Sequence, residues 1–326
     1  MNRRRALSML LAAVAVEPSK LGALNFASAA SGGVIRIITY TQAGTASDLI
    51  ARLAAKTYDD ALHQTIIVEN MTGAGGTIAV VYVGRSRPDG KTFLLGNDSV
   101  MMAPIIAQLT GQNVSYDPQK DFAPIALLAE ADYIVVANGS KGPHTLDELI
   151  SEAKKRPGQL NYGSAGVGST QHLGMELLKH LAGIDIVHVP YRGIPNALAD
   201  VAGGRVDVVL TGIAPALSLT RAGQLKVLGI SGNRRSPLIP EAQPISEKVP
   251  GFTVTSWFGL FAPAGMPERD IEEFGRNVRN GMKSAEVTAL LSAQGIIPVD
   301  AGSSELRALL ATDTERFSSI VQQLKK

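Results

Sequence analysis

One complete strand–loop–helix unit is spelled out by residues 34–62, VIRIITYTQAGTASDLIARLAAKTYDDAL. Residues 34–38 are mostly β-branched and apolar, which favours a buried strand. Small and polar residues follow at 41–47, and Ser47 is a suitable N-cap for a helix over 48–62. Such units are the building blocks of α/β folds with a mostly parallel sheet.

The same unit recurs along the chain. Further strands are predicted at 65–68, 91–95, 160–162, 186–189 and 206–210. They group into two α/β blocks, roughly 34–125 and 133–228, and the tail from about 232 lacks the strands for a third. We expect this tail to pack back on the first block. The chain would then cross between the blocks twice, near 125–134 and 227–231, and two crossings make a hinge.

Composition limits the classes of function. A chain of 326 residues usually folds into two domains, because it is longer than one hydrophobic core normally accommodates. The net charge of +2 and the 5% aromatic content, without a basic stripe, give no nucleic-acid surface. There is no cysteine, so thiolate metal sites and cysteine nucleophiles are excluded. His172 and His180 are eight apart on one predicted helix, which is not a metal-ligand spacing, and no dinucleotide fingerprint follows the first strand. We expect neither metal nor cofactor.

The N-terminus reads as an export signal. Three arginines at 3–5 precede an apolar stretch over 6–16, which is too short to span a bilayer. An A-x-A pattern at 27–29 predicts cleavage before Ala30. We therefore expect a signal peptide over 1–29 and a periplasmic mature protein. A retained leader would instead indicate a cytosolic binding module.

The strand-to-helix loops carry the strongest chemical signal. Helix N-termini present unpaired backbone N–H groups and partial positive charge, and small residues let a ligand approach them. Each such terminus contributes about 0.3–1 kcal/mol to anion binding, and up to about 2 when partly buried. Loops of this kind occur in both blocks, beyond the carboxyl ends of strands, where open α/β sheets bind ligands. This pattern predicts an anion site between the blocks.

A hydrolase is the alternative from another class. Ser164 or Ser169 could act with His172 on a small ester or amide, because a catalytic triad is defined by spatial arrangement. However, the nucleophile-elbow pattern would need glycine where Tyr162 stands. His188, inside an apolar strand, is interpreted as a core histidine.

Several longer motifs resemble a known family. They are VENMTGAGG (68–76), YDPQKDF (116–122), NYGSAGVGS (161–169), HVPYRG (188–193) and GGRVD (203–207). In combination, order and spacing they resemble the Bug proteins, the periplasmic substrate-binding subunits of tripartite tricarboxylate transporters. The similarity covers nearly all of the chain beyond residue 30.

The resemblance implies a two-lobed α/β fold, the type II periplasmic-binding-protein fold with a two-crossover hinge. Lobe 1 would comprise 30–127 and 231–326, and lobe 2 would comprise 128–230. The ligand would be a small mono- or dicarboxylate, including aromatic acids and amino acids, held by main-chain amides, hydroxyls and bridging waters. The partners would be membrane subunits of a transporter of this type or, less often, a signalling protein, and no residue would be catalytic. A monomer is the default expectation for the oligomeric state.

The resemblance also implies a set of ligand-binding residues. They are Gln42, Ala43, Thr45, Ser47, Asn97, Ser99, Ser164, Gly168, Ser169, Thr170, Pro190, Tyr191 and Thr211. The chain departs from the family at the first loop, where an aromatic, a proline and paired glycines are usual. Thr211 also stands where many members carry an acid. The family pattern therefore does not name the ligand of this chain.

Overall fold

The computed structural model describes residues 34–62, 64–111 and 113–324, so the expected signal peptide at 1–29 lies outside the described residues. The strands are β1 (Ile35–Thr39), β2 (Ile66–Asn70), β3 (Thr92–Asn97), β4 (Phe122–Asn138), β5 (Asn161–Ser164), β6 (Val187–Pro190), β7 (Val208–Gly212), β8 (Leu225–Ile230), β9 (Thr255–Pro263) and β10 (Ile296–Ala301). The helices are α1 (Ala46–Leu62), α2 (Thr77–Gly84), α3 (Asp98–Thr110), α4 (Leu146–Lys155), α5 (Thr170–Ala182), α6 (Ile194–Ala202), α7 (Ile213–Arg221), α8 (Glu268–Met282), α9 (Ala285–Ser292) and α10 (Ser303–Leu324), with 3₁₀ turns at Ala74–Gly76 and Ile245–Glu247.

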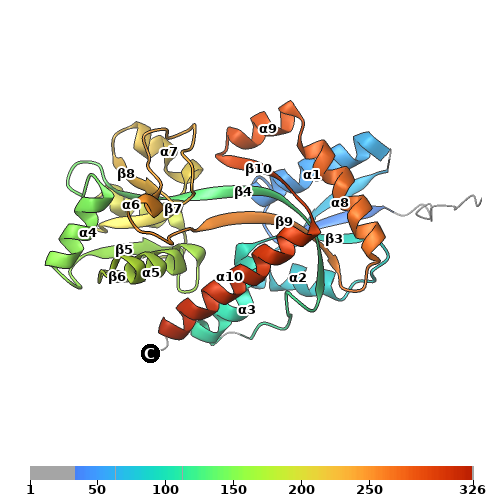
Figure 1. The fold of residues 1–326 in the computed structure, drawn as a ribbon, viewed down its shortest axis with the longest axis horizontal. Helices are drawn as coiled ribbons and strands as arrows, with labels where there is room; N and C mark the ends of the chain where they lie inside the picture. Colours follow the sequence, from blue (N-terminus) through green and yellow to red (C-terminus); the bar gives the residue numbers. More distant parts are fainter. Residues whose placement is uncertain (1–33, 63, 112, 325–326) are drawn as a thin grey trace, which may run out of the picture. The chain divides into compact units, whose positions relative to one another are not determined.

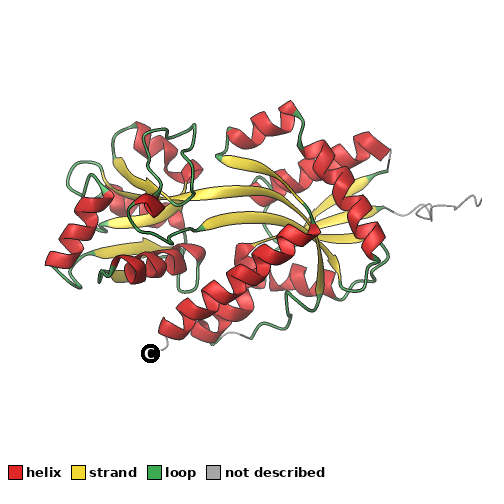
Figure 2. Cartoon of the chain, viewed as in Figure 1, coloured by secondary structure: helices red, strands yellow, loops and turns green. Residues whose placement is uncertain are grey.

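The strands form one continuous, branched sheet with helices packed against it (Figures 1 and 2). The strand order is β2-β1-β3-β9-β4-β7-β5-β6, and β10 and β8 also pair with β4. β1 is parallel to β2 and β3, and β5 is parallel to β6 and β7. We call β1, β2, β3, β9 and β10 with their helices the first lobe, and β5 to β8 with theirs the second lobe.

Strand β4 belongs to both lobes. Its first part pairs antiparallel with β9, from Phe122 opposite Pro263 to Asp132 opposite Thr255. Its second part pairs with β7, beginning at Tyr133 opposite Gly212. The expected first crossing at 125–134 is therefore one unbroken strand.

Residues 231–254 connect β8 to β9. The chain beyond β8 stays against the second lobe: the Ile230 N–H donates to the Gln243 carbonyl at 2.9 Å. Lys248 forms an ion pair with Asp147 of α4, with 2.9 Å between Nζ and Oδ2. β9, which starts at Thr255, then carries the chain back and pairs with β3. Beside β4, β9 is thus the second connection.

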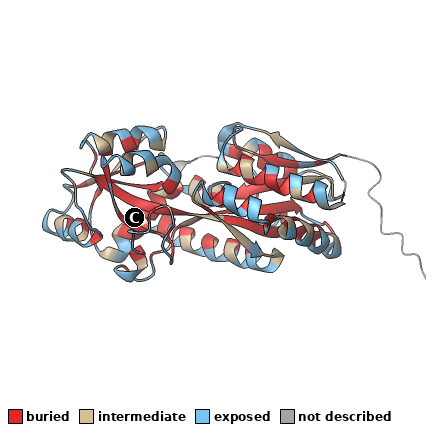
Figure 3. Ribbon diagram, turned by 90° about the horizontal axis from the view of Figure 1, so that it is seen from above, coloured by how far each residue is buried: buried red, intermediate tan, exposed pale blue. Residues whose placement is uncertain are grey.

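Buried apolar side chains follow the strands (Figure 3). On one face of the first lobe, Ile37 and Phe93 pack under α1 and α8, and Phe93 stacks on Phe274 with ring centres 4.1 Å apart. In the second lobe, Ile134 of β4 and Val209 of β7 share a cluster with residues of α6 and α7. This burial fixes the strand ends from which the candidate site loops start.

Candidate ligand-binding site

The first predicted site loop lies between β1 and α1. Helix α1 begins at Ala46, so Ser47 is inside the helix and buried rather than its N-cap. Thr45 has the capping role, because its Oγ1 accepts a hydrogen bond from the Asp48 N–H at 3.4 Å. Gln42 and Ala43, like Thr45, are exposed at the tip of the loop.

Hydrogen bonds hold this loop in place. The Thr45 hydroxyl lies 2.7 Å from that of Thr41 and donates to the Gln42 carbonyl at 2.9 Å. Asp48 accepts from the Gly44 N–H at 2.9 Å and from Arg52 Nε at 3.0 Å. Burial opposes ionisation of Asp48, but these bonds outweigh it and hold the pKa of its carboxyl below the usual range. A loop fixed in advance loses less entropy when a ligand binds.

The second predicted loop joins β3 to α3. Asn97 is the N-cap of α3, and its Oδ1 accepts from the Val100 N–H at 3.4 Å. The same oxygen accepts a 2.7 Å hydrogen bond from the Tyr40 hydroxyl, and burial raises the pKa of that phenol. Tyr40 was not among the predicted residues, although it directly precedes the first loop. Ser99 is exposed.

In the second lobe, the loop between β5 and α5 folds on itself. Ser169 is the N-cap of α5: its Oγ accepts from the His172 N–H at 3.2 Å and donates to the Gly166 carbonyl at 2.8 Å. Gly168 has a φ of 81°, a left-handed conformation that favours glycine. The Gly168 N–H donates to His172 Nδ1 at 3.1 Å, so this amide is already used.

A buried ring stack lies behind this loop. Ser164 is fully buried, and its Oγ is 2.6 Å from His188 Nε2. The His188 ring stacks on His172 at 4.1 Å and on Tyr162 at 4.9 Å between centres. Of the pairs considered for a hydrolase, neither serine is hydrogen-bonded to the His172 ring: Ser164 is paired with His188, and Ser169 accepts from the His172 backbone N–H. The interpretation of His188 as a packed histidine with a satisfied partner agrees with this geometry.

This stack predicts a pH effect on stability. Burial, helped by the neighbouring His172, lowers the pKa of His188 to about 4, against 6.5 for an ordinary histidine. Between these values the unfolded chain binds the proton and the folded chain does not, so His188 lowers stability as pH falls from 6.5 towards 4. We expect the free energy of unfolding, measured in urea, to fall less between pH 7 and pH 5 in His188→Gln than in the wild type. If the free energy of unfolding changes equally with pH in the two proteins, the prediction is contradicted. The other titrating groups are present in both proteins, so their contributions cancel in the comparison.

The remaining predicted residues lie further along the second lobe. Pro190 is exposed at the end of β6, and the next N–H, of Tyr191, donates to the Ser164 carbonyl at 3.0 Å. The Tyr191 hydroxyl donates to Asp200 Oδ2 at 2.6 Å, and burial together with this bond raises the pKa of the phenol to about 12. Thr211 is fully buried and its hydroxyl donates to the Gly212 carbonyl at 3.3 Å.

The two lobes meet at the starts of α3 and α5. Thr170 Oγ1 is 3.5 Å from Ser99 Oγ and donates to Asp98 Oδ2 at 2.7 Å. Asp98 Oδ1 accepts from Ser256 of β9, also at 2.7 Å. Two predicted site residues from different lobes, Ser99 and Thr170, are thus brought together. Asp98 lies between the predicted Asn97 and Ser99, but only the fold reveals that its carboxylate is buried. Ser256 was missed.

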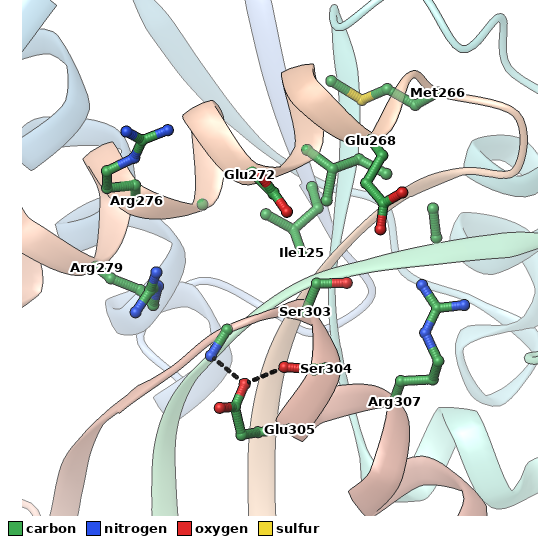
Figure 4. Close-up of a pocket in the computed structure, with 14 residues that line it drawn as sticks. Ile125, Met266, Glu268, Glu272, Arg276, Arg279, Ser303, Ser304, Glu305 and Arg307 are labelled. Atoms are coloured by element: carbon green, nitrogen blue, oxygen red, sulfur yellow. Dashed lines mark hydrogen bonds between the residues drawn. The ribbon is translucent and has the colours of Figure 1, made fainter.

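A separate cavity lies in the first lobe, with a volume of about 790 Å³. It is lined by α8, the start of α10 and the first residues of β4, and Figure 4 shows Arg276 and Arg279 on one side of it and Arg307 on the other. Arg279 pairs with Asp300, with 2.9 Å between Nη1 and Oδ1. None of the predicted ligand-binding residues lines this cavity.

Within residues 34–62, 64–111 and 113–324, no group of three histidine, cysteine or acidic side chains is placed to hold a metal ion. None of the helices in this part of the chain is long and apolar enough to cross a membrane.

Comparison with known proteins decides the family. The family model described as "Tripartite tricarboxylate transporter family receptor" matches residues 50–325. The chain belongs to this family. The receptor is 30% identical to Protein BugT of Bordetella pertussis over 290 residues, which is 89% of this chain and 88% of BugT. The predicted resemblance to the Bug proteins is confirmed.

Solved structures agree with this assignment. The receptor is similar to MatC from Rhodopseudomonas palustris with bound malate, at 31% identity and a TM-score of 0.70, over 88% of this chain and 98% of MatC. A second R. palustris protein, solved with adipate, is 28% identical with a TM-score of 0.74, over 88% of this chain and 96% of that one. The fold is the predicted two-lobed α/β fold of periplasmic solute-binding receptors.

Proposed function

We propose that this receptor captures a small organic acid, a mono- or dicarboxylate, between its two lobes. The observation that carries the proposal is the meeting of Ser99 and Thr170, 3.5 Å apart, at the starts of two helices from different lobes. Both helix starts present backbone N–H groups, which favour an anion. Malate and adipate in the two R. palustris structures support a carboxylate as the ligand class.

The predicted site residues divide into two roles in this proposal. The exposed ones contact the ligand: Gln42, Ala43, Thr45, Ser99 and Pro190. The others are partly or fully buried and shape the loops: Ser47, Asn97, Ser164, Gly168, Ser169, Tyr191 and Thr211. Thr170 is also buried, but its hydroxyl lies 3.5 Å from that of Ser99 and reaches the ligand beside it. Ser164 and Ser169 illustrate the second role, because their hydroxyls are bonded to the Gly166 carbonyl and cannot also donate to a ligand without leaving it.

Closure of the lobes would complete the site. We place the hinge in β4, near Asp132, and at the start of β9, near Thr255, because these strands connect the lobes. The second lobe would then run from about 133 to 254, which moves the expected return at 231 to the start of β9. Closure excludes water and so strengthens the polar contacts to the ligand.

Export and partners follow from the same proposal. The signal peptide at 1–29 would be cleaved before Ala30, which releases the receptor as a periplasmic monomer. The closed, loaded form would then be recognised by membrane subunits of a tripartite tricarboxylate transporter.

Binding of malate and adipate by residues 30–326 tests the proposal. At 100 times its dissociation constant, a ligand should add about 2.7 kcal/mol of stability, which a thermal shift detects. Calorimetry gives the affinity, and NMR shows whether the compound is recovered unaltered. Conversion of the compound would contradict a pure binding role.

Ser99→Ala removes an exposed hydroxyl from the proposed site. A hydrogen bond to a charged group contributes about 1.5–3 kcal/mol, so we expect affinity to fall about 10-fold to 100-fold. Arg276→Ala, in the separate first-lobe cavity, is the control and should leave the affinity unchanged. An equal loss in both variants, or no loss in Ser99→Ala, would remove Ser99 from the site.

A further inference from the structure

A buried carboxylate stands at the contact between the lobes. Asp98 is 1% exposed and accepts hydrogen bonds from Thr170 of the second lobe and Ser256 of β9, each at 2.7 Å. It lies in the chain between Asn97 and Ser99, both predicted ligand residues. A negative charge at this place disfavours an anionic ligand beside it.

The direction of one hydrogen bond depends on the charge of Asp98. While the carboxylate is ionised it can only accept, so Thr170 must use its single O–H proton on Asp98. The Thr170 oxygen then presents only lone pairs to Ser99, 3.5 Å away, and to any ligand. Once Asp98 is protonated at Oδ2, it can donate to Thr170 Oγ1, and the Thr170 proton becomes free to bind a ligand carboxylate.

The surroundings favour this protonation. Burial raises the pKa of Asp98 to about 6, although the bonds from Ser256 and Thr170 act in the opposite direction. Asp313 of α10 adds a second negative charge, and its own carboxylate is bonded to Trp257 and Arg316. The phenols of Tyr40 and Tyr133 also face Asp98, and their pKa values are raised by burial, so they stay neutral. On α5, the His172 side chain accepts a hydrogen bond from the Gly168 N–H.

We propose that Asp98 is a positioning residue that makes carboxylate binding take up a proton, by turning the Thr170 hydroxyl from Asp98 towards the ligand. The inference rests on the proposed function and adds a selection rule to it. The receptor binds a carboxylate best when one proton enters with it, and the ionised Asp98 weakens carboxylate binding at higher pH.

The test compares the dissociation constants of wild type and Asp98→Asn for malate and adipate at pH 5, 6, 7 and 8. Asparagine is always neutral and can donate to Thr170, so its binding should follow only the ligand's own titration. With half-protonation near pH 6, the wild-type affinity relative to Asp98→Asn should fall about tenfold from pH 5 to pH 7. Calorimetry at pH 7 in two buffers of different ionisation enthalpy should show about one more proton taken up by the wild type.

Two Thr170 variants separate this role from a structural one. Thr170→Ser keeps the hydroxyl and should keep the pH dependence, whereas Thr170→Val should bind weakly at every pH and lose the dependence. A constant ratio of affinities between wild type and Asp98→Asn would overturn the inference while leaving the proposed function intact. Absence of malate and adipate binding by the wild type at every pH would overturn both.

Discussion

Trp257→Ala is expected to lower the free energy of unfolding by about 3–5 kcal/mol. Trp257 of β9 is fully buried, and its ring centre lies 6.3 Å from that of Phe261. Its Nε1 donates to Asp313 Oδ2 of α10 at 2.7 Å. Truncation leaves a cavity between β9 and α10 and also removes a donor from a buried carboxylate.

A second variant separates the contribution of the indole N–H to stability from that of the ring. Trp257→Phe keeps most of the apolar volume but leaves Asp313 with Arg316 as its charged partner, so a smaller loss of about 1–3 kcal/mol is expected. Trp257 is the single tryptophan of the chain, so unfolding should be followed by circular dichroism rather than fluorescence. Equal losses in the phenylalanine and alanine variants would assign the whole effect to the hydrogen bond and contradict the cavity argument.

Ser231→Ala should lower the free energy of unfolding by about 2–4 kcal/mol, although it removes only one oxygen atom. Ser231 is fully buried beside the hinge, and its Oγ accepts from the Tyr133 N–H at 2.8 Å and donates to the Val254 carbonyl. Alanine leaves both backbone groups buried without this partner. Because Tyr133 and Val254 lie where the chain passes between the lobes, we also expect increased hydrogen exchange there.

An exposed serine provides the control for this prediction. Ser218 lies on the outside of α7, and Ser218→Ala should change the free energy of unfolding by no more than about 0.5 kcal/mol. If Ser231→Ala behaves like Ser218→Ala in urea unfolding, then the two backbone groups find other partners and the argument fails.

The sequence pattern predicted the local units well. The expected strand at 34–38 corresponds to β1, and the small polar loops do precede helices, because alternating strand and helix propensities are local properties. The cap of α1 was misplaced by two residues, since Thr45 and Ser47 are both suitable caps. The network between Thr41 and Thr45 decided between them, and composition does not reveal such a network.

The sequence pattern does not reveal which strands pair when they are far apart in the chain. The apolar run of β4 looks like a linker between two blocks, because nothing in it records that its halves pair with different strands. The same limit hid the burial of Asp98, whose hydrogen-bond partners Thr170 and Ser256 are distant in the chain. The ligand-facing loops were named from family resemblance, and their division into contacting and supporting residues required the structure.

The place of β9 between β3 and β4 also bears on how the protein folds. A newly made chain emerges from its N-terminus, so β1, β2 and β3 must wait for a neighbouring strand that is made late. The elements of the second lobe, in contrast, are encoded without interruption, and contacts close in sequence form faster than distant ones. The second lobe is therefore expected to fold early. The sheet of the first lobe stays incomplete, with an unpaired edge at β3, until β9 is made.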